Sequence, residues 1–216
     1  LPKAQKKNIK KIKSLVTKSH FSPLKRKKLF GHKPQPTNNE ITATPMIGCG
    51  RRHNELNRAI RQLVQNSEKS LVLFTPYFNL PKVLTRDVIK ALKRGVNISI
   101  TVGDKTANDF YIADEKSFST IGIIPYIYEM LLTRFVKRWQ KYIDKGQLEI
   151  RLWKDHNNSF HLKGIVADQR FHLLTGSNLN PRAWSLDLEN GILLDDPQGK
   201  LLPNFEKELA TIYQHT

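Results

Sequence analysis

From residue 41 onward, the chain alternates short apolar runs with longer segments in which apolar residues recur every three or four positions. Short apolar runs predict β-strands, and the longer periodic segments predict amphipathic helices. The predicted strands lie at 41–48, 70–78, 96–102, 147–153 and 187–194, with another after residue 163. The predicted helices lie at about 54–66, 81–95, 123–145 and 203–213. This alternation predicts an α/β domain in which helices flank a sheet.

Local signals set the ends of these elements. Asn54 is a residue type that caps a helix through its side-chain oxygen, and Pro81 suits the first turn of the next helix. Gly95 and Gly146 follow periodic segments, where glycine commonly ends a helix. We expect the second strand to finish in an exposed group of residues: Pro76, Tyr77 and Phe78.

The segment 123–145 is amphipathic and basic. Its apolar positions are Ile124, Ile127, Tyr128, Leu131, Phe135, Trp139 and Tyr142. Its cations are Arg134, Lys137, Arg138 and Lys141. Such a stripe faces either the core of the domain or the surface of a membrane, and the sequence leaves both interpretations open.

Charge is concentrated at the start of the chain. Residues 1–36 hold 12 of the 36 Lys and Arg residues and no Asp or Glu, in a protein of net charge +17. We therefore expect residues 1–40 to form a basic linker or arm, and residues 41–216 to form the folded domain. The arm is either a solvated tail or a segment attracted to a polyanion, which means anionic lipid or nucleic acid.

Two features of the sequence bear on the cellular location of the protein. Cys49 is the single cysteine, so no internal disulfide forms. The longest nearly uncharged apolar stretch, residues 121–128, is far shorter than the roughly 20 residues that span a bilayer. We expect a cytoplasmic protein, and the initial Leu1 suggests that the sequence is part of a longer polypeptide.

The strongest chemical signal is His161-x-Lys163, followed by the apolar run 165–167. The run predicts a strand, on which residues two positions apart point to the same face. An imidazole and an ammonium group would then lie side by side. That pair supplies a nucleophile for phosphorus and a fixed cation for the charge that gathers on its oxygens.

With Asp168 and the later Gly176-Ser177 pair, these residues match the HxKxxxxD signature, and the chain resembles the phospholipase D superfamily. Three longer stretches resemble the C-terminal half of bacterial CDP-diacylglycerol–serine O-phosphatidyltransferases: FTPYFNLP, VGDKTANDFYI and GSNLNPRAWSLDLENGILLDDP. The resemblance implies a phospholipase D-like half, a mixed β-sheet flanked by helices. Full-length members carry two such signatures, so it also implies a second HxK half, from the same chain or from a homodimer mate.

The resemblance implies roles for individual residues. His161 and Lys163 would be catalytic, and Asp168 would support the hairpin and the lysine, with Gly176 and Ser177 completing the motif. Glu189 would hold the other ring nitrogen of the histidine, with Asp187 as the second candidate. The interval from Asp168 to Gly176 is one residue longer than usual, which leaves open whether Asn178 or Asn180 supplies an amide to the phosphate. If extended, that stretch would point both amides the same way. Two further residues would line the substrate pocket: Arg182 and Trp184.

The implied reaction forms phosphatidylserine and CMP from CDP-diacylglycerol and L-serine through a phosphatidyl-histidine. No His, Cys and Asp cluster has the spacing of metal ligands, so we predict no metal and no cofactor. We expect the enzyme to bind an anionic membrane surface peripherally, on the inner face of the cytoplasmic membrane, and the ribosome is a further partner.

The signature is shared more widely than this reaction. Cardiolipin synthases, hydrolytic phospholipases D and nucleases carry the same groups. A basic module that binds RNA or ribosomes without catalysis is the non-enzymatic alternative. Either histidine of a two-half enzyme is a candidate for the nucleophile.

Overall fold

The computed structural model describes residues 40–112 and 120–216. Nearly all of the predicted basic arm, residues 1–39, therefore lies outside the described residues. The chain divides into the units Leu1–Glu40 and Ile41–Thr216, and the basic arm stays a prediction.

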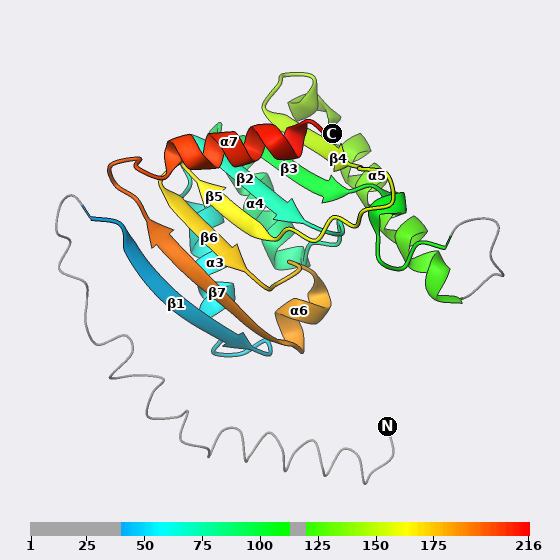
Figure 1. Ribbon diagram of the computed structural model, residues 1–216, viewed down its shortest axis with the longest axis horizontal. Helices are drawn as coiled ribbons and strands as arrows, with labels where there is room; N and C mark the ends of the chain where they lie inside the picture. Colours follow the sequence, from blue (N-terminus) through cyan, green and yellow to red (C-terminus); the bar gives the residue numbers. More distant parts are fainter. Residues whose placement is uncertain (1–39, 113–119) are drawn as a thin grey trace, which may run out of the picture. The chain divides into compact units, whose positions relative to one another are not determined.

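The domain is built on a seven-stranded sheet of order β1-β7-β6-β5-β2-β3-β4 (Figure 1). The strands are β1 Thr42–Cys49, β2 Ser70–Thr75, β3 Asn97–Gly103, β4 Leu148–Trp153, β5 Gly164–Ala167, β6 Phe171–Thr175 and β7 Leu188–Asp195. Strands β2, β3 and β4 are parallel, whereas β5, β6, β7 and β1 pair with their neighbours in antiparallel fashion. The predicted mixed sheet of an α/β fold is confirmed.

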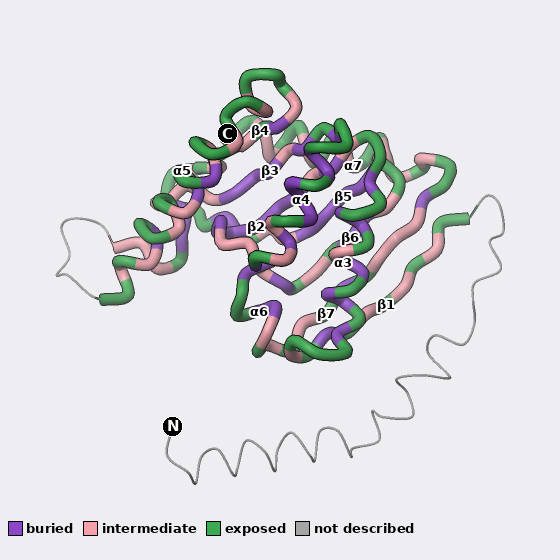
Figure 2. Tube along the Cα trace, turned by 180° about the vertical axis from the view of Figure 1, so that it is seen from behind, coloured by how far each residue is buried: buried purple, intermediate pink, exposed green. Residues whose placement is uncertain are grey.

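Helices cover both faces of this sheet (Figure 1). The α-helices are α3 Glu55–Asn66, α4 Lys82–Arg94, α5 Ile124–Ile143, α6 Pro181–Ser185 and α7 Leu202–Tyr213. The side chains of β2 alternate between the faces: Leu71 and Leu73 join the core under α3 and α4, while Phe74 joins a smaller cluster under α7. The purple, buried part of the trace in Figure 2 follows these central strands and the helices that cover them.

The predicted helix ends are largely confirmed. Asn54 caps α3, and its side chain accepts a hydrogen bond from the backbone N–H of Asn57. Pro81 immediately precedes α4, and Gly95 ends that helix with a φ of 97°, which glycine adopts without strain. One expectation is wrong: strand β2 stops at Thr75, and Pro76 to Phe78 are buried rather than exposed. Phe78 packs in the main core, tilted against Phe135 of α5.

Helix α5 buries only part of its surface against the domain, and its predicted contact with a membrane stays a prediction. Leu132 and Phe135 are buried against the domain. In contrast, Tyr126, Ile127 and Met130 remain exposed. Among the described residues, no helix is both long enough and apolar enough to cross a bilayer.

Candidate active site

His161 and Lys163 lie side by side just before strand β5. Lys163 Nζ is 2.8 Å from His161 Nδ1 and donates a hydrogen bond of 2.7 Å to the His161 carbonyl oxygen. The expectation that the pair lies on a strand is wrong, because β5 begins at Gly164. The pairing between β5 and β2 ends at Gly164 and Phe74. The juxtaposition of the two groups therefore depends on their direct contact.

The ring nitrogens of His161 face groups of opposite charge. A lysine ammonium donates hydrogen bonds and accepts none, so a neutral imidazole accepts at Nδ1 and carries its proton on Nε2. Nε2 lies 3.4 Å from Asp109 Oδ2, and 60 % of the His161 side chain is exposed. The imidazole is thus accessible and held between a cation and an anion.

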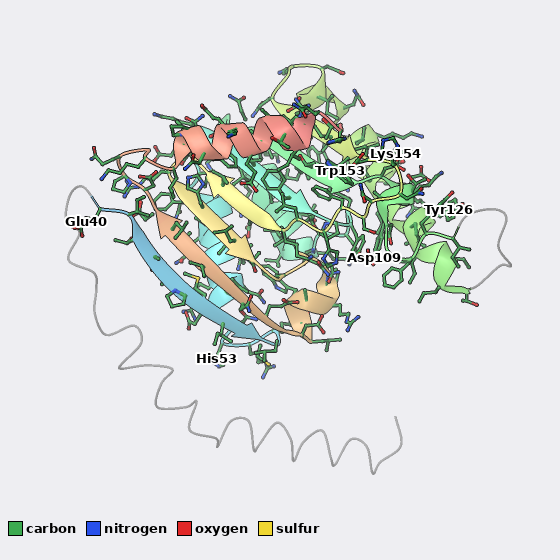
Figure 3. All side chains as sticks on the ribbon, in the orientation of Figure 1. Glu40, His53, Asp109, Tyr126, Trp153 and Lys154 are labelled. Atoms are coloured by element: carbon green, nitrogen blue, oxygen red, sulfur yellow. The ribbon has the colours of Figure 1, made fainter. Side chains whose placement is uncertain are left out.

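Asp109 is the site residue that the sequence reasoning missed. It follows β3 and lies near the edge of the sheet where β2 and β3 end (Figure 3). Tyr77, which follows β2, donates a hydrogen bond of 2.6 Å to Asp109 Oδ2. The carboxyl ends of parallel strands meet at one edge of a sheet, where ligands of open α/β sheets bind. Applied to the sequence stretches FTPYFNLP and VGDKTANDFYI, this rule would have identified both Tyr77 and Asp109.

Asp109 is ionised despite partial burial. Burial alone would raise its pKa, but hydrogen bonds from Tyr77 and Ser159 and the charges of His161 and Lys163 outweigh burial and lower the pKa. Burial and the bond to Asp109 raise the pKa of Tyr77, so its hydroxyl remains a donor. Its ring stacks on that of Tyr128 from α5, with centroids 5.2 Å apart.

Lys163 and Glu189 form a second charged pair in the site. Burial lowers the pKa of Lys163, while the carboxylates of Asp109 and Glu189 act in the opposite direction. Burial and the neighbouring Asp187 raise the pKa of Glu189, while Lys163 and Arg182 act to lower it. A Cβ atom at Gly176 would lie 3.1 Å from Glu189 Oε2, so glycine gives this carboxylate room.

The ring contact predicted for Glu189 is made by another residue. Among the described residues, Asp109 is the carboxylate that lies against the imidazole of His161, whereas Glu189 influences the site through Lys163. Asp187, the second candidate, lies 3.3 Å from Arg182 Nε. Catalytic roles for Glu189 and Asp187 therefore stay predictions, and the expected contact of Glu189 with His161 is corrected.

The two asparagines have different surroundings. Leu179 between them has a φ of 51°, so the stretch is not extended as expected. Asn180 caps α6, accepting a hydrogen bond of 2.9 Å from the Ala183 N–H. Asn178 Oδ1 is buried and has no hydrogen-bond partner among the described residues. Because the Asn180 side chain is held in the cap of α6 and the Asn178 oxygen makes no such bond, Asn178 is the better candidate for an amide whose Nδ2–H group turns toward a bound phosphate.

The remaining predicted residues divide between surface and core. Arg182 is exposed beside the site, near enough to lower the pKa of Tyr128 against the larger raising effect of burial. Trp184 is only 7 % exposed and packs in the main core, so the expectation that it lines a pocket is wrong. Ser177 is buried, and its hydroxyl accepts a 3.4 Å hydrogen bond from the Leu179 N–H, which supports the turn.

Asp168 lies at the far end of β5 from the catalytic pair. Its carboxylate accepts hydrogen bonds from the backbone N–H groups of Glu68, Lys69 and Ser70 at the start of β2. The predicted support of the hairpin is thus present. The predicted support of Lys163 is not, because a whole strand separates the two side chains. In residues 40–112 and 120–216, no group of three or more His, Cys, Asp and Glu side chains is arranged to hold a metal ion.

Comparison with known proteins identifies the family of this chain. Residues 60–213 match the family described as cardiolipin synthase, PLD-like domain. The chain is 50 % identical over 179 residues to CDP-diacylglycerol–serine O-phosphatidyltransferase of Escherichia coli, covering 83 % of this chain and 40 % of the relative. The enzyme of the same name from Haemophilus influenzae is 49 % identical, with 82 % and 39 % covered.

Solved structures agree. The crystal structure of phosphatidylserine synthase from Haemophilus influenzae matches with a TM-score of 0.80 and 48 % identity, over 82 % of this chain and 40 % of that one. A phospholipase D family member from Salmonella typhimurium, Nuc, shares the fold with a TM-score of 0.54 at 14 % identity, over 81 % and 96 % of the two chains. The chain spans about 40 % of the length of its phosphatidylserine synthase relatives, resembles their C-terminal half, and belongs to the phospholipase D-like family.

Proposed function

We propose that this chain is one catalytic half of a phosphatidyltransferase that forms phosphatidylserine and CMP from CDP-diacylglycerol and L-serine. The observation that carries the proposal is the 2.8 Å contact between Lys163 and an exposed His161 imidazole. This contact occurs in a chain 50 % identical to an enzyme named for that reaction. The wider family includes cardiolipin synthases, so the acceptor alcohol is the point that experiment must decide.

The reaction is two displacements at phosphorus. In the first, the imidazole of His161, or of its counterpart in a second half, attacks the phosphorus that carries diacylglycerol. A P–N bond forms, the P–O bond of the pyrophosphate breaks, and CMP leaves with the bridging oxygen. In the second, the serine hydroxyl attacks phosphorus while the other imidazole takes its proton, and the P–N bond breaks.

Lys163 supplies the positive charge for these steps. Its ammonium would move from His161 Nδ1 to the non-bridging phosphate oxygens, where negative charge increases in the transition state. Nδ1 can then carry the ring proton, which leaves the lone pair of Nε2 for attack on phosphorus or for proton transfer. The Nδ2–H group of Asn178 is the second candidate donor, because this side chain, unlike that of Asn180, is not held in a helix cap. We propose that these donors act without a metal; loss of activity in EDTA, restored by a single divalent ion, would contradict that.

A second HxK half completes the site in this proposal. On the face of the sheet that α7 packs against, β1 and β7 are left uncovered by the described helices (Figure 1). Ile192 of β7 pairs with Leu174 on one side and Pro45 on the other. Large apolar side chains are exposed here, Leu174 at 56 % and Ile192 at 47 %. Exposed apolar patches of this kind mark interfaces, and we assign this one to the other half.

The prediction for the isolated chain follows from that assignment. It should be inactive as a monomer and active only when two copies pair or when the other half is supplied. Sedimentation analysis beside the activity assay tests this, and an active monomer would contradict it.

Contact with the substrate requires docking at a membrane surface. Helix α5 exposes Tyr126, Ile127 and Met130, and Arg134 and Lys137 are exposed further along it. Each Lys or Arg near an anionic surface contributes about 1 kcal/mol. We propose that this helix and the basic residues 1–36 hold the enzyme peripherally on the inner face of the cytoplasmic membrane, and that the same charge accounts for ribosome binding. Vesicle co-sedimentation that is insensitive to both anionic lipid and salt would contradict the proposal.

The deciding experiment measures CMP release from vesicles containing CDP-diacylglycerol, using a protein that contains both halves. Release that depends on L-serine, with phosphatidylserine as product, supports the transferase. Release that ignores serine would indicate a hydrolase, and no release would indicate a binding module.

A further inference from the structure

Asp109 is a carboxylate in the wall of the site that makes the ring contact expected of Glu189, and the two displacements at phosphorus give it no further role. It forms no bond to phosphorus, and its charge is opposite to what a phosphate-binding group needs. Nevertheless it lies 3.4 Å from His161 Nε2, with 39 % of its side chain exposed. The neighbouring hydrogen bonds and cations lower its pKa, so it is an anion in the working pH range. An exposed carboxylate beside a phosphate site would attract a cationic group of the substrate.

The acceptor alcohol of the proposed reaction provides that cation. L-serine carries an ammonium group on the carbon adjacent to the hydroxymethyl group. In a gauche conformer, the hydroxyl oxygen and the ammonium nitrogen are about 3 Å apart. This separation is comparable to the 3.4 Å between His161 Nε2 and Asp109 Oδ2. When Lys163 binds the phosphate instead of His161 Nδ1, the ring proton can move to Nδ1 and leave Nε2 free to accept a proton. With His161 as the base, a serine whose hydroxyl is at Nε2 therefore brings its ammonium within reach of the Asp109 carboxylate.

The surroundings of Asp109 suit an ammonium group. Tyr77 occupies Oδ2 with a hydrogen bond of 2.6 Å, which fixes the orientation of the carboxylate. The stacked rings of Tyr77 and Tyr128 border it, and phenol rings beside a carboxylate favour a bound cation. The exposed guanidinium of Arg182 acts on Tyr128 and Glu189. Its Nε donates to Asp187 at 3.3 Å, and its remaining N–H groups are candidates to bind the carboxylate of an amino acid near the same site.

We propose that Asp109 forms the ammonium subsite for the acceptor amino acid, and that it selects L-serine over water and over alcohols without an amino group. This inference rests on the proposed function and deepens it. A different role for Asp109, orientation of His161 alone, would act equally on every acceptor. The two roles therefore differ in what they do to acceptor choice.

The test measures how the phosphatidyl-enzyme partitions between acceptors in the protein with both halves. The ratio of phosphatidylserine to phosphatidic acid formed in the same reaction compares serine with water, and any loss of total activity cancels in that ratio. Hydrogen bonds between charged groups are worth about 1.5–3 kcal/mol. Asp109→Asn should therefore lower the serine-to-water ratio by roughly tenfold to a hundredfold.

Two substrate analogues separate the ammonium from the carboxylate. With ethanolamine, which has the ammonium alone, Asp109→Asn should lower transfer relative to water by a similar factor. With 3-hydroxypropionate, which has the carboxylate alone, the ratio to water should stay within twofold. Asp109→Glu keeps the charge and should restore part of the serine ratio. Asp144→Asn removes an exposed carboxylate bonded to Gln140 on α5 and should leave every ratio unchanged.

The outcomes separate this inference from the proposed function. A wild-type protein that releases no CMP with serine overturns both. A wild-type protein that transfers to serine, combined with an Asp109→Asn variant whose serine-to-water ratio changes less than twofold, overturns the ammonium subsite alone. Equal losses of the ratio to water for serine, ethanolamine and 3-hydroxypropionate would also overturn it, because the loss would then not depend on the ammonium group of the acceptor.

Discussion

The two ends of the β5–β6 hairpin belong to one sequence signature and have different physical roles. At the start of β5, His161 and Lys163 contact each other at 2.8 Å. Past the other end of the strand, Asp168 binds three consecutive backbone N–H groups that precede and begin β2. One end presents reactive groups to solvent, and the other ties two distant segments together. One sequence signature can therefore contain both reactive residues and a residue that stabilises the fold.

The turn at the Asp168 end shows how this architecture is built. Asp168 and Gln169 both have positive φ, 54° and 58°, and the Arg170 N–H donates to the Ala167 carbonyl at 3.1 Å. Two central residues with positive φ define the type I′ turn, which matches the twist of a two-residue hairpin. Aspartate tolerates this conformation better than most residues. Its side chain is then free to bind the strand that follows α3.

The largest expected effect is at the reactive end. His161→Ala in the protein with both halves should reduce transfer by at least about a thousandfold, because a nucleophile or proton acceptor is lost. Its free energy of unfolding should change by less than about 0.5 kcal/mol, since the side chain is largely exposed. CMP release and thermal unfolding measure the two effects. Activity within tenfold of wild type would remove His161 from the mechanism.

Lys163→Ala should rank second. Loss of a cation that stabilises the transition state costs about 3 kcal/mol, which is roughly a hundredfold in kcat. The matched control is Lys93→Ala, an exposed lysine in the last turn of α4, which should retain full activity. Equal losses in the two variants would indicate a general effect of charge on membrane binding instead.

At the architectural end, Asp168→Asn should act on stability. Asparagine tolerates positive φ, so the variant keeps the turn and weakens the charge-assisted bonds to β2. We expect the free energy of unfolding to fall by about 1–2 kcal/mol, with kcat per folded molecule unchanged within twofold. Denaturant unfolding and kinetics at low temperature test this. A stable variant with a hundredfold lower kcat would mean that Asp168 belongs to the chemistry.

Tyr77→Phe sharpens the comparison within the site. The phenylalanine ring should preserve the stack on Tyr128 and remove the hydroxyl that donates to Asp109. Loss of one such bond costs about 1 kcal/mol, so the serine-to-water ratio should fall several-fold. An unchanged ratio would show that Asp109 does not need the hydroxyl.

The smallest effect concerns pH. Lys163 must be protonated to stabilise charge, and burial lowers its pKa. The rate of CMP release should therefore decline at a lower pH than the titration of an ordinary lysine would give. Lys163→Arg keeps the charge at alkaline pH and should move this decline upward. A decline at the same pH in both proteins would assign it to another group.

Features that depend on local sequence were predictable. Asn54, Gly95 and the alternation of apolar residues identified the helices and strands because capping and periodicity act over a few residues. The proximity of His161 and Lys163 was also predicted, although the strand assigned to them was wrong. Gly164 pairs with Phe74 and Leu174, and β5 begins there although both neighbouring strands run one residue further.

Features that depend on strand order need the order of the strands as well as the residues. Tyr77 and Asp109 are 32 residues apart and meet because β2 and β3 are parallel neighbours. Trp184 was misplaced for a related reason: the short helix α6 turns the indole into the core. Residue type alone does not show which way a five-residue helix faces.

The most direct test of the central claim is isotope exchange between labelled CMP and CDP-diacylglycerol in the absence of serine. A phosphatidyl-histidine formed in a step separate from serine attack predicts exchange in the wild-type protein and its loss when the nucleophilic histidine, His161 or its counterpart in the second half, is replaced by alanine. Exchange that strictly requires serine, or that continues unchanged when each of the two histidines is replaced in turn, would contradict the account.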